Sequence, residues 1–360
     1  MQKPTPRAAR ILSLILAFML LAAVFAGCGK SDSTDNGTSG TGTADATPGT
    51  SSEASPDANP EAAAPADTYV VKIAYGTALC HAPLHVAIKR GLFEAEGLSY
   101  EAVPMNTAAT LEGAGTNAVD AGFGLIGKFA QPLENGLGIK LTAGIHSGCI
   151  KIVTADGTGV ESVADLKGKI IGVADLADSP AVITRRVLFD AGFSLDEITE
   201  AIQVYSADAL PAALSGGEIA AYAAMDPAVS IAVRDNGFKV LVDTAESALF
   251  AGEFCCATFV TDKFIADHPG LAEKYTNAIL KAAEWIAANP AETAALQVDN
   301  EFVAGDAEFN GTLLATYGFH ASVDGGYDSL QTTLEQKQKI GVLKADTDTA
   351  ALLERGYHKF

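Results

Sequence analysis

Residues 69–98, YVVKIAYGTALCHAPLHVAIKRGLFEAEGL, contain the pattern that decides the predicted fold. The first seven residues are rich in β-branched and aromatic side chains, which favour a strand. Pro83 then opens an apolar run that Gly91 closes. This run is predicted to be a helix, because proline is tolerated in the first turn of a helix and glycine favours its end. A short strand followed closely by a helix is the building unit of α/β proteins.

The same alternation of strands and helices continues along the chain in two groups. The first group has expected strands at 100–103, 121–125 and 140–145 and a helix at 107–116. The second group has expected strands at 170–173, 202–205, 220–224 and 239–242 and helices at 180–191 and 207–215. After residue 255 the sequence turns helical, and residues 269–288 keep apolar side chains on one helical face for longest.

This order predicts an α/β fold with two lobes, each an open, mostly parallel sheet flanked by helices. Lobe 1 is expected to contain residues 68–150 and 250–360, and lobe 2 residues 151–249. Because the chain passes between the lobes twice, a hinge is expected near residues 149–153 and 250–256. Ligands bind at the carboxyl ends of parallel strands, so two facing sheet edges predict a small-molecule site in the cleft.

The N-terminal residues predict export. Lys3, Arg7 and Arg10 precede an apolar run at residues 11–25, which is the length of a secretory signal rather than of a membrane span. The small residues before Cys28 resemble a bacterial lipobox, in which the cysteine is lipidated and becomes the new N-terminus. We therefore predict a signal peptide at 1–27, a lipid anchor on Cys28 and an extracytoplasmic location at the cell membrane.

Residues 28–67 are mostly small and polar, so they bury too little apolar surface to fold and are predicted to be a tether. The chain has a formal charge of −20, and the three bases of the signal peptide leave about −23 on the rest. This high negative charge argues against a nucleic-acid partner. An anionic ligand stays compatible, because helix N-termini bind anions without basic side chains. We expect a monomer.

The expected ends of the strands supply the candidate site. In lobe 1 they are followed by the loop before Pro83, by two polar residues, by a glycine-containing turn and by a histidine and a cysteine. In lobe 2, a serine is expected to cap the helix at 180–191, with proline as its first residue. The candidate ligand-binding residues are Thr77, Cys80, His81, Asn106, Thr107, Gly124, Ile126, His146, Cys149, Ser179, Asp226 and Cys256.

Five segments in this order resemble the nitrate/sulfonate/taurine-type ABC substrate-binding proteins, which include binders of thiamine pyrimidine precursors. The segments span residues 81–98, 117–124, 163–172, 214–227 and 264–275. The resemblance implies the two-lobed type II periplasmic-binding-protein fold and an ABC permease and ATPase complex as partners. It also implies a small ligand, either an anion like a sulfonate, nitrate or taurine or a heterocycle like the thiamine pyrimidine.

Four cysteines besides Cys28 are expected near the cleft, namely Cys80, Cys149, Cys255 and Cys256. Three roles for them remain open. A Cys80–Cys149 disulfide suits an oxidising exterior. Unpaired thiols can pack as small apolar side chains. A soft metal held by cysteine and histidine has suitable ligand types, although no tight C-x-x-C spacing is present.

The resemblance also raises an enzymatic alternative. Fungal thiamine-pyrimidine synthases share the fold, carry a histidine that His81 matches, and have a cysteine cluster that residues 255–259 half-match. The sequence contains no Ser-His-Asp order, paired acids or phosphate loop. We therefore predict a binding protein without catalytic residues, cofactor or resident metal. A thiamine-pyrimidine-synthase-like enzyme, or a metal-binding protein that uses the His/Cys cluster, is the alternative.

Overall fold

The computed structural model describes residues 67–360, so the predicted signal peptide, Cys28 and almost all of the tether lie outside the described residues. The strands form two separate sheets. In order across the sheet, the first contains β11 (Gly318–Ser322), β4 (Ile139–Ser147), β10 (Cys256–Thr261), β3 (Ala121–Leu125), β1 (Val70–Tyr75) and β2 (Ser99–Pro104). The second contains β7 (Ile202–Val204), β6 (Ile171–Val173), β8 (Ala221–Met225), β5 (Ile150–Thr154) and β9 (Lys239–Asp243).

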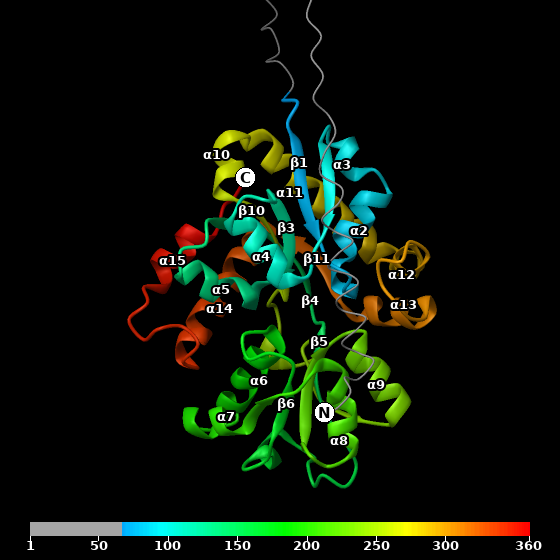
Figure 1. Cartoon of the computed structure of the whole chain (residues 1–360), viewed down its shortest axis with the longest axis vertical. Helices are drawn as coiled ribbons and strands as arrows, with labels where there is room; N and C mark the ends of the chain where they lie inside the picture. The colour runs from blue at the N-terminus through cyan, green and yellow to red at the C-terminus, as the bar shows by residue number, and fades with distance from the viewer. Residues whose placement is uncertain (1–66) are drawn as a thin grey trace, which may run out of the picture. The chain divides into compact units, whose positions relative to one another are not determined.

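Helices cover both faces of each sheet, and we call each sheet with its helices a lobe (Figure 1). Lobe 1 contains α2 (Ala82–Lys89), α3 (Leu92–Ala95), α4 (Thr107–Gly115), α5 (Ile126–Glu134), α10 (Asp262–Asp267), α11 (Pro269–Ala288), α12 (Pro290–Asp299), α13 (Ala307–Thr316), α14 (Val323–Lys339) and α15 (Thr349–Gly356). Lobe 2 contains α6 (Ser179–Asp190), α7 (Leu195–Ala201), α8 (Leu210–Ser215) and α9 (Ala228–Asn236). Short 3₁₀ turns are η1 (Leu79–His81), η2 (Val163–Leu166), η3 (Ala207–Ala209) and η4 (Ala248–Phe250).

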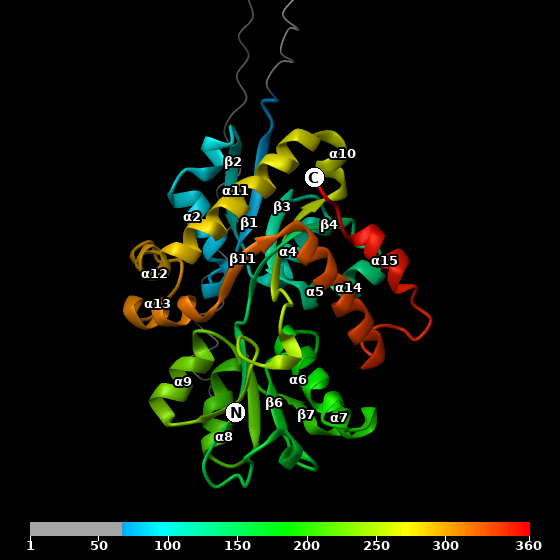
Figure 2. The same ribbon diagram turned by 180° about the vertical axis from the view of Figure 1, so that it is seen from behind.

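The core of lobe 1 lies on both sides of its sheet. On one face α2 and α11 pack against β1, and Figure 2 shows α11 crossing that face. The buried side of α11 carries Leu271, Tyr275 and Ile279 at helical spacing, which is why this amphipathic segment docks as a helix. On the other face α5, α14 and α15 pack against β10 around Phe259. The predicted α/β class with two lobes is therefore confirmed.

The strand directions differ in part from the mostly parallel sheets that were expected. In the first sheet β1 pairs in parallel with β2 and β3, but β10 pairs antiparallel with β3 and β4. In the second, β6 pairs in parallel with β7 and β8, whereas β5 pairs antiparallel with β8 and β9. Both sheets are mixed because β5 and β10, the strands that enter a sheet after the chain has crossed between lobes, run against their neighbours. The helical expectation immediately after residue 255 was wrong, since β10 occupies it.

Two crossings join the lobes. The first runs from β4 through Gly148 and Cys149 into β5, which Figure 1 shows as a continuous descent of the chain. The second returns from β9 to β10. Thr244 ties them together, because its Oγ1 accepts hydrogen bonds from the backbone N–H of Cys149 at 3.2 Å and of Ile150 at 3.1 Å. Among residues 67–360 no helix combines the length and hydropathy needed to cross a membrane.

Candidate functional site

The N-terminal ends of α5 and α6 meet where the two lobes face each other. Lys128 of α5 forms an ion pair of 2.8 Å with Asp178, which caps α6, and both side chains are only 16% exposed. A Cβ atom built on Gly127 would lie 3.1 Å from the Oγ of Ser179, so the first turns of the two helices touch. The structure therefore shows the lobes in contact, with a glycine permitting the close approach.

A small cavity lies beside this contact. Its volume is about 60 Å³, which is room for a few water-sized groups. Both lobes contribute to its wall. The lining includes Leu125, Ile126 and Gly127 from the end of β3 and the start of α5, Ser179, Val182, Ile183 and Arg186 from α6, and Thr333, Gln336 and Lys337 from α14.

Lys337 is the unusual member of this wall. It is 2% exposed, and no hydrogen bond or ion pair of its ammonium group is found among residues 67–360. Burial lowers the pKa of Lys337 to about 8, because a poorly solvated ammonium loses hydration that nothing replaces. The other charged side chains around the cavity are paired: Arg186 forms two 2.6 Å hydrogen bonds with Glu253, and Lys128 pairs with Asp178. The wall therefore carries one unpaired positive charge.

Ser179 is placed differently from the expectation. Asp178, not Ser179, is the N-cap of α6, and its side chain accepts from the backbone N–H of Ser179 at 2.7 Å. The one-residue shift leaves the Ser179 hydroxyl free of the capping role. The residue is 4% exposed and its Oγ has no hydrogen-bond partner. A buried hydroxyl without a partner on the cavity wall is a polar group that a ligand can satisfy.

His81 follows β1 and precedes α2. The backbone N–H of Gly76 donates to its Nδ1 at 3.0 Å, and the side chain makes no hydrogen bond that caps α2. Burial lowers the pKa of His81 to about 4, so the neutral ring carries its proton on Nε2. His85 supports the same loop, since its Nε2 lies 2.8 Å from the Gly76 carbonyl oxygen.

The four cysteines converge with His146 at the junction of the lobes, and we call Cys80, His146, Cys149, Cys255 and Cys256 the cysteine cluster. The ligand atoms of Cys80, His146 and Cys256 lie within 4.8 Å of one another, and so do those of Cys149, Cys255 and Cys256. The backbone sets this arrangement: Cys256 pairs with His146 across β10 and β4, and the N–H of Cys255 donates to the His146 carbonyl oxygen at 2.8 Å.

All four thiols are free in the structure, so the Cys80–Cys149 disulfide is not formed. The shortest sulfur contact instead joins Cys149 and Cys255, at 2.8 Å. The hydrogen bond with Cys255 raises the pKa of Cys149, and burial raises that of Cys256, while hydrogen bonds from Cys149 and Cys256 lower the pKa of Cys255.

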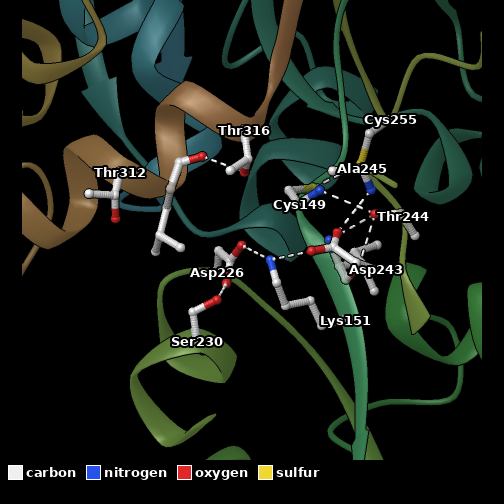
Figure 3. Close-up of polar contacts among 12 residues, drawn as sticks. Cys149, Lys151, Asp226, Ser230, Asp243, Thr244, Ala245, Cys255, Thr312 and Thr316 are labelled. Atoms are coloured by element: carbon white, nitrogen blue, oxygen red, sulfur yellow. Dashed lines mark hydrogen bonds and ion pairs between the residues drawn. The ribbon is translucent and has the colours of Figure 1, made fainter. Parts of the chain in front are cut away.

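Asp226 belongs to a buried ionic network at the end of lobe 2 that adjoins the first crossing, where its backbone N–H donates to the Cys149 carbonyl oxygen at 3.0 Å. Its Oδ2 lies 2.7 Å from the Nζ of Lys151, which also pairs with Asp243 at 3.1 Å, and Ser230 donates to its Oδ1 at 2.5 Å (Figure 3). Figure 3 shows these groups directed at one another beneath Cys149. The network occupies both carboxylate oxygens, so the structure gives Asp226 a role in joining β5, β8 and β9.

The remaining predicted residues lie at strand ends with local partners. The side chain of Asn106 caps α4, accepting from Ala109 N–H at 2.9 Å. Gly124 allows the Phe129 ring to approach, since a Cβ there would lie 3.1 Å from it. Thr77 is exposed after β1, and the side chain of Thr107 lies outside the described residues. Ile126 lines the cavity. Ligand contact by these residues stays a prediction.

Sequence reasoning missed Lys128 and Lys337. The segment before Ile340 looks like a solvated charged helix, but its buried side contains Leu330, Leu334 and Lys337 at spacings of four and three. That spacing places a lysine on an apolar stripe and was the available signal. For Lys128 there was no comparable signal, because its partner Asp178 lies on another lobe.

Comparison with known proteins gives one family and many similar structures. The family model described as NMT1/THI5 like matches residues 79–293. No curated protein sequence matches the chain significantly. Solved structures resemble it over most of its length, and the likeness, at identities of 14–22%, concerns the fold.

Three of these structures are ligand-binding proteins. The alkanesulfonate-binding protein SsuA from Xanthomonas axonopodis pv. citri, bound to MOPS, is 17% identical with a TM-score of 0.66, covering 82% of this chain and 100% of its own. The nitrate-binding protein NrtA from Synechocystis PCC 6803 is 14% identical with a TM-score of 0.67, covering 80% and 86%. The zinc-bound ligand-binding component of an ABC-type import system from Staphylococcus aureus is 16% identical with a TM-score of 0.61, covering 75% and 92%.

Proposed function

The chain belongs to the NMT1/THI5-like family, and from this premise we propose that it is the extracytoplasmic solute-binding protein of an ABC importer. It captures a small anion between its lobes and presents it to the permease and ATPase complex. The similar structures include proteins named for binding alkanesulfonate and nitrate, which supports this class of function. These similar proteins bind solutes, so the thiamine-pyrimidine-synthase-like alternative is not favoured.

Lys337 is the observation that carries the choice of an anion. Its ammonium group is buried in the cavity wall without a carboxylate partner, and a buried charge without a partner is costly. A ligand that brings a negative charge supplies the missing partner. A neutral heterocycle leaves the charge unpaired, so among the two ligand classes implied by the resemblance the anion is favoured.

Two further groups suit the same ligand. The hydroxyl of Ser179 lacks a partner and faces the cavity. The N-terminus of α5 opens onto it at Ile126 and Gly127, and the exposed N–H groups and dipole of a helix start favour negative charge. Lys337 can donate charge-assisted hydrogen bonds, and Ser179 and the start of α5 offer neutral donors. A sulfonate or nitrate group can accept hydrogen bonds from all three.

The anchor completes the proposal. Ala26, Gly27 and Cys28 follow the apolar run of the signal peptide, so lipidation of Cys28 would hold the mature protein at the outer face of the membrane. The tether would then let the two lobes reach the permease.

The test is a calorimetric titration of the full chain carrying Cys28→Ser, using taurine, an alkanesulfonate, nitrate and an aminopyrimidine as separate ligands. We expect an anion to bind, and Lys337→Met to weaken its binding by about 10–100-fold, the value of a hydrogen bond to a charged group. Lys339→Met, two residues away and exposed on the same helix, should bind normally.

Mass spectrometry of the released solute separates a binding protein from an enzyme, because a binding protein returns its ligand unchanged. Equal affinity of the Lys337→Met and Lys339→Met variants for the anion would refute the proposed site. Chemical conversion of the ligand would refute the proposed class.

A further inference from the structure

The cysteine cluster brings together sulfur and imidazole atoms that could bind a metal ion and that the proposed anion site does not use. Four sulfurs and one imidazole come together from η1, β4, the first crossing and the start of β10. Cys80, His146 and Cys256 form one group of three within 4.8 Å, and Cys149 and Cys255 form another with the same Cys256. Cys256 is therefore common to both groups, and the five residues make one continuous set of ligands.

His146 provides a second, independent observation. Its ring is fully buried, and its Nε2 has no hydrogen-bond partner. Tyr317 stacks on the ring at 5.3 Å and Phe319 lies at 5.0 Å, so aromatic neighbours fix its orientation. A buried imidazole nitrogen without a partner is costly, and a bound ion is one way to satisfy it. The sulfurs of Cys80 and Cys256 lie within 4.8 Å of a nitrogen of this ring.

Neither apolar packing nor a disulfide satisfies the Nε2 of His146. Thiols that merely pack as apolar groups need no imidazole beside them. A disulfide between Cys149 and Cys255, whose sulfurs lie 2.8 Å apart, would still leave Cys80, His146 and Cys256 together without a partner. Neither group of three includes a carboxylate, so the set does not suit the oxygen-seeking ions Mg²⁺ and Ca²⁺.

We infer that the cysteine cluster is a binding site for one thiophilic cation of the Cu(I) or Zn(II) type. Cys80, Cys256 and His146 supply three ligands, and Cys149 or Cys255 supplies the fourth ligand, which is the third thiolate. Thiolate and imidazole are the ligands that these ions prefer. Each coordinating thiol gives its proton to solvent as the sulfur–metal bond forms, so no oxidant or reductant is required.

The location gives the ion a structural consequence. Cys149 lies in the first crossing and Cys255 at the end of the second, whereas Cys80 and His146 belong to lobe 1. A cation bound by Cys80, His146, Cys256 and either Cys149 or Cys255 would tie one of the two crossings to lobe 1. The inference goes beyond the anion site and does not depend on it, because Lys337 and Ser179 take no part in the cluster.

The experiment uses the full chain with Cys28→Ser, reduced under anaerobic conditions and loaded separately with Cu(I) alone and Zn(II) alone. We expect about one equivalent of one ion to be retained after desalting, measured by elemental analysis, with Cu(I)–thiolate absorption as a second readout for copper. Cys256→Ser removes the shared ligand. It should weaken binding by more than about 100-fold, since even outer partners of metal ligands contribute about 10–100-fold.

Cys80→Ser and His146→Gln serve as further variants, and His268→Gln, a histidine of the lobe 1 surface paired with Asp67, is the matched control. Melting curves of the unloaded variants show whether each one folds. Retention of metal by Cys256→Ser and Cys80→Ser at the unmodified level would overturn the inference. Intact masses that show disulfides in protein isolated without reductant, with no metal retained after reduction, would overturn it as well.

Discussion

The Lys337 side chain is 2% exposed in the interlobe cavity wall, and no carboxylate among residues 67–360 forms an ion pair with it. Its folded-state pKa of about 8 lies below the value of about 10.4 for an unfolded lysine. The unfolded chain therefore holds more protons between pH 8 and about 10.4, and stability should rise with pH across that window. Below pH 8 the full cost of the buried charge is present, up to about 3 kcal/mol.

We predict that Lys337→Met stabilises the empty protein by about 1–3 kcal/mol at pH 7, because methionine fills the space without a charge. The difference in unfolding free energy between variant and parent should shrink as the pH rises from 8 to 10.4. Denaturant unfolding at several pH values measures it. The facing groups Arg186, Glu253 and Lys128 are common to both proteins, so their titration cancels in the difference. A destabilised variant, or a difference independent of pH, would contradict the prediction.

The titration of Lys337 predicts that the affinity for an anion depends on pH. An anion that binds the charged form of Lys337 should lose affinity above pH 8, by about tenfold per pH unit once the lysine is mostly neutral. Calorimetric titration at pH 7, 8, 9 and 10 measures this affinity. Lys339→Met, which changes an exposed lysine of α14, should keep the full profile, and Lys337→Met should flatten it. An affinity that is constant from pH 7 to 10 would exclude Lys337 from the anion site.

The first crossing between the lobes depends on the shape of its backbone. Gly148 has a φ of +70°, and a Cβ there would lie 2.5 Å from the Ala245 Cβ on the second crossing. The two crossings can therefore run side by side only where this residue has no side chain.

We predict that Gly148→Ala costs about 2–4 kcal/mol of stability, from left-handed backbone strain and from overpacking against Ala245. Gly168→Ala is the matched control, because Gly168 has a similar φ of +72° with no atom within 4 Å of the added Cβ. It should cost only the backbone term of about 1 kcal/mol. Thermal and denaturant unfolding compare the two. Equal losses would mean that the crossings are not tightly packed.

Elements with a clear periodic pattern were predictable from the sequence. The strand at 121–125 and the helix at 269–288 agree with β3 and α11 in their bounds. β5 and β10 were not predicted. Their segments were expected to be hinge and helix, and like β3 they are buried in every residue, so they have no alternation of polar and apolar side chains that would identify a strand. The mixed sheets follow from these two strands, so their absence from the prediction explains why parallel sheets were expected.

The cysteine cluster was predictable as a neighbourhood but not as a set of contacts. Strand ends placed Cys80, His146 and Cys149 at one edge, and the second crossing added Cys255 and Cys256. The pairing of β10 between β3 and β4 decides which sulfurs meet, and this pairing joins segments more than 100 residues apart. Local sequence carries no information on that register.

The position of the chain relative to the membrane depends on Cys28, which lies outside the described residues. We predict that Cys28→Ser abolishes lipidation, so the mature protein lacks the acyl chains that hold it in the membrane fraction. Ser31→Ala, in the tether, should leave the anchor intact. Fractionation of expressing cells, followed by intact-mass measurement of the protein, compares the Cys28→Ser and Ser31→Ala variants. Continued processing at the same bond and membrane retention of Cys28→Ser would refute the anchor.

The lobes in this structure are in contact, and the pair between Lys128 and Asp178 is the ionic bond that spans them. Asp178→Asn keeps a side chain that can cap α6 but removes the charge, so it should shift the molecule toward an open arrangement. A pair of this kind contributes up to about 1 kcal/mol, which predicts anion binding weakened by up to about fivefold.

Small-angle scattering of the full chain with Cys28→Ser should show a larger radius of gyration without ligand than at saturation, and a larger ligand-free value in Asp178→Asn. Asp267→Asn removes an exposed ion pair with Lys263 within α10 alone and should change neither quantity. A radius of gyration that is the same with and without ligand would rule out hinge closure as the mode of capture.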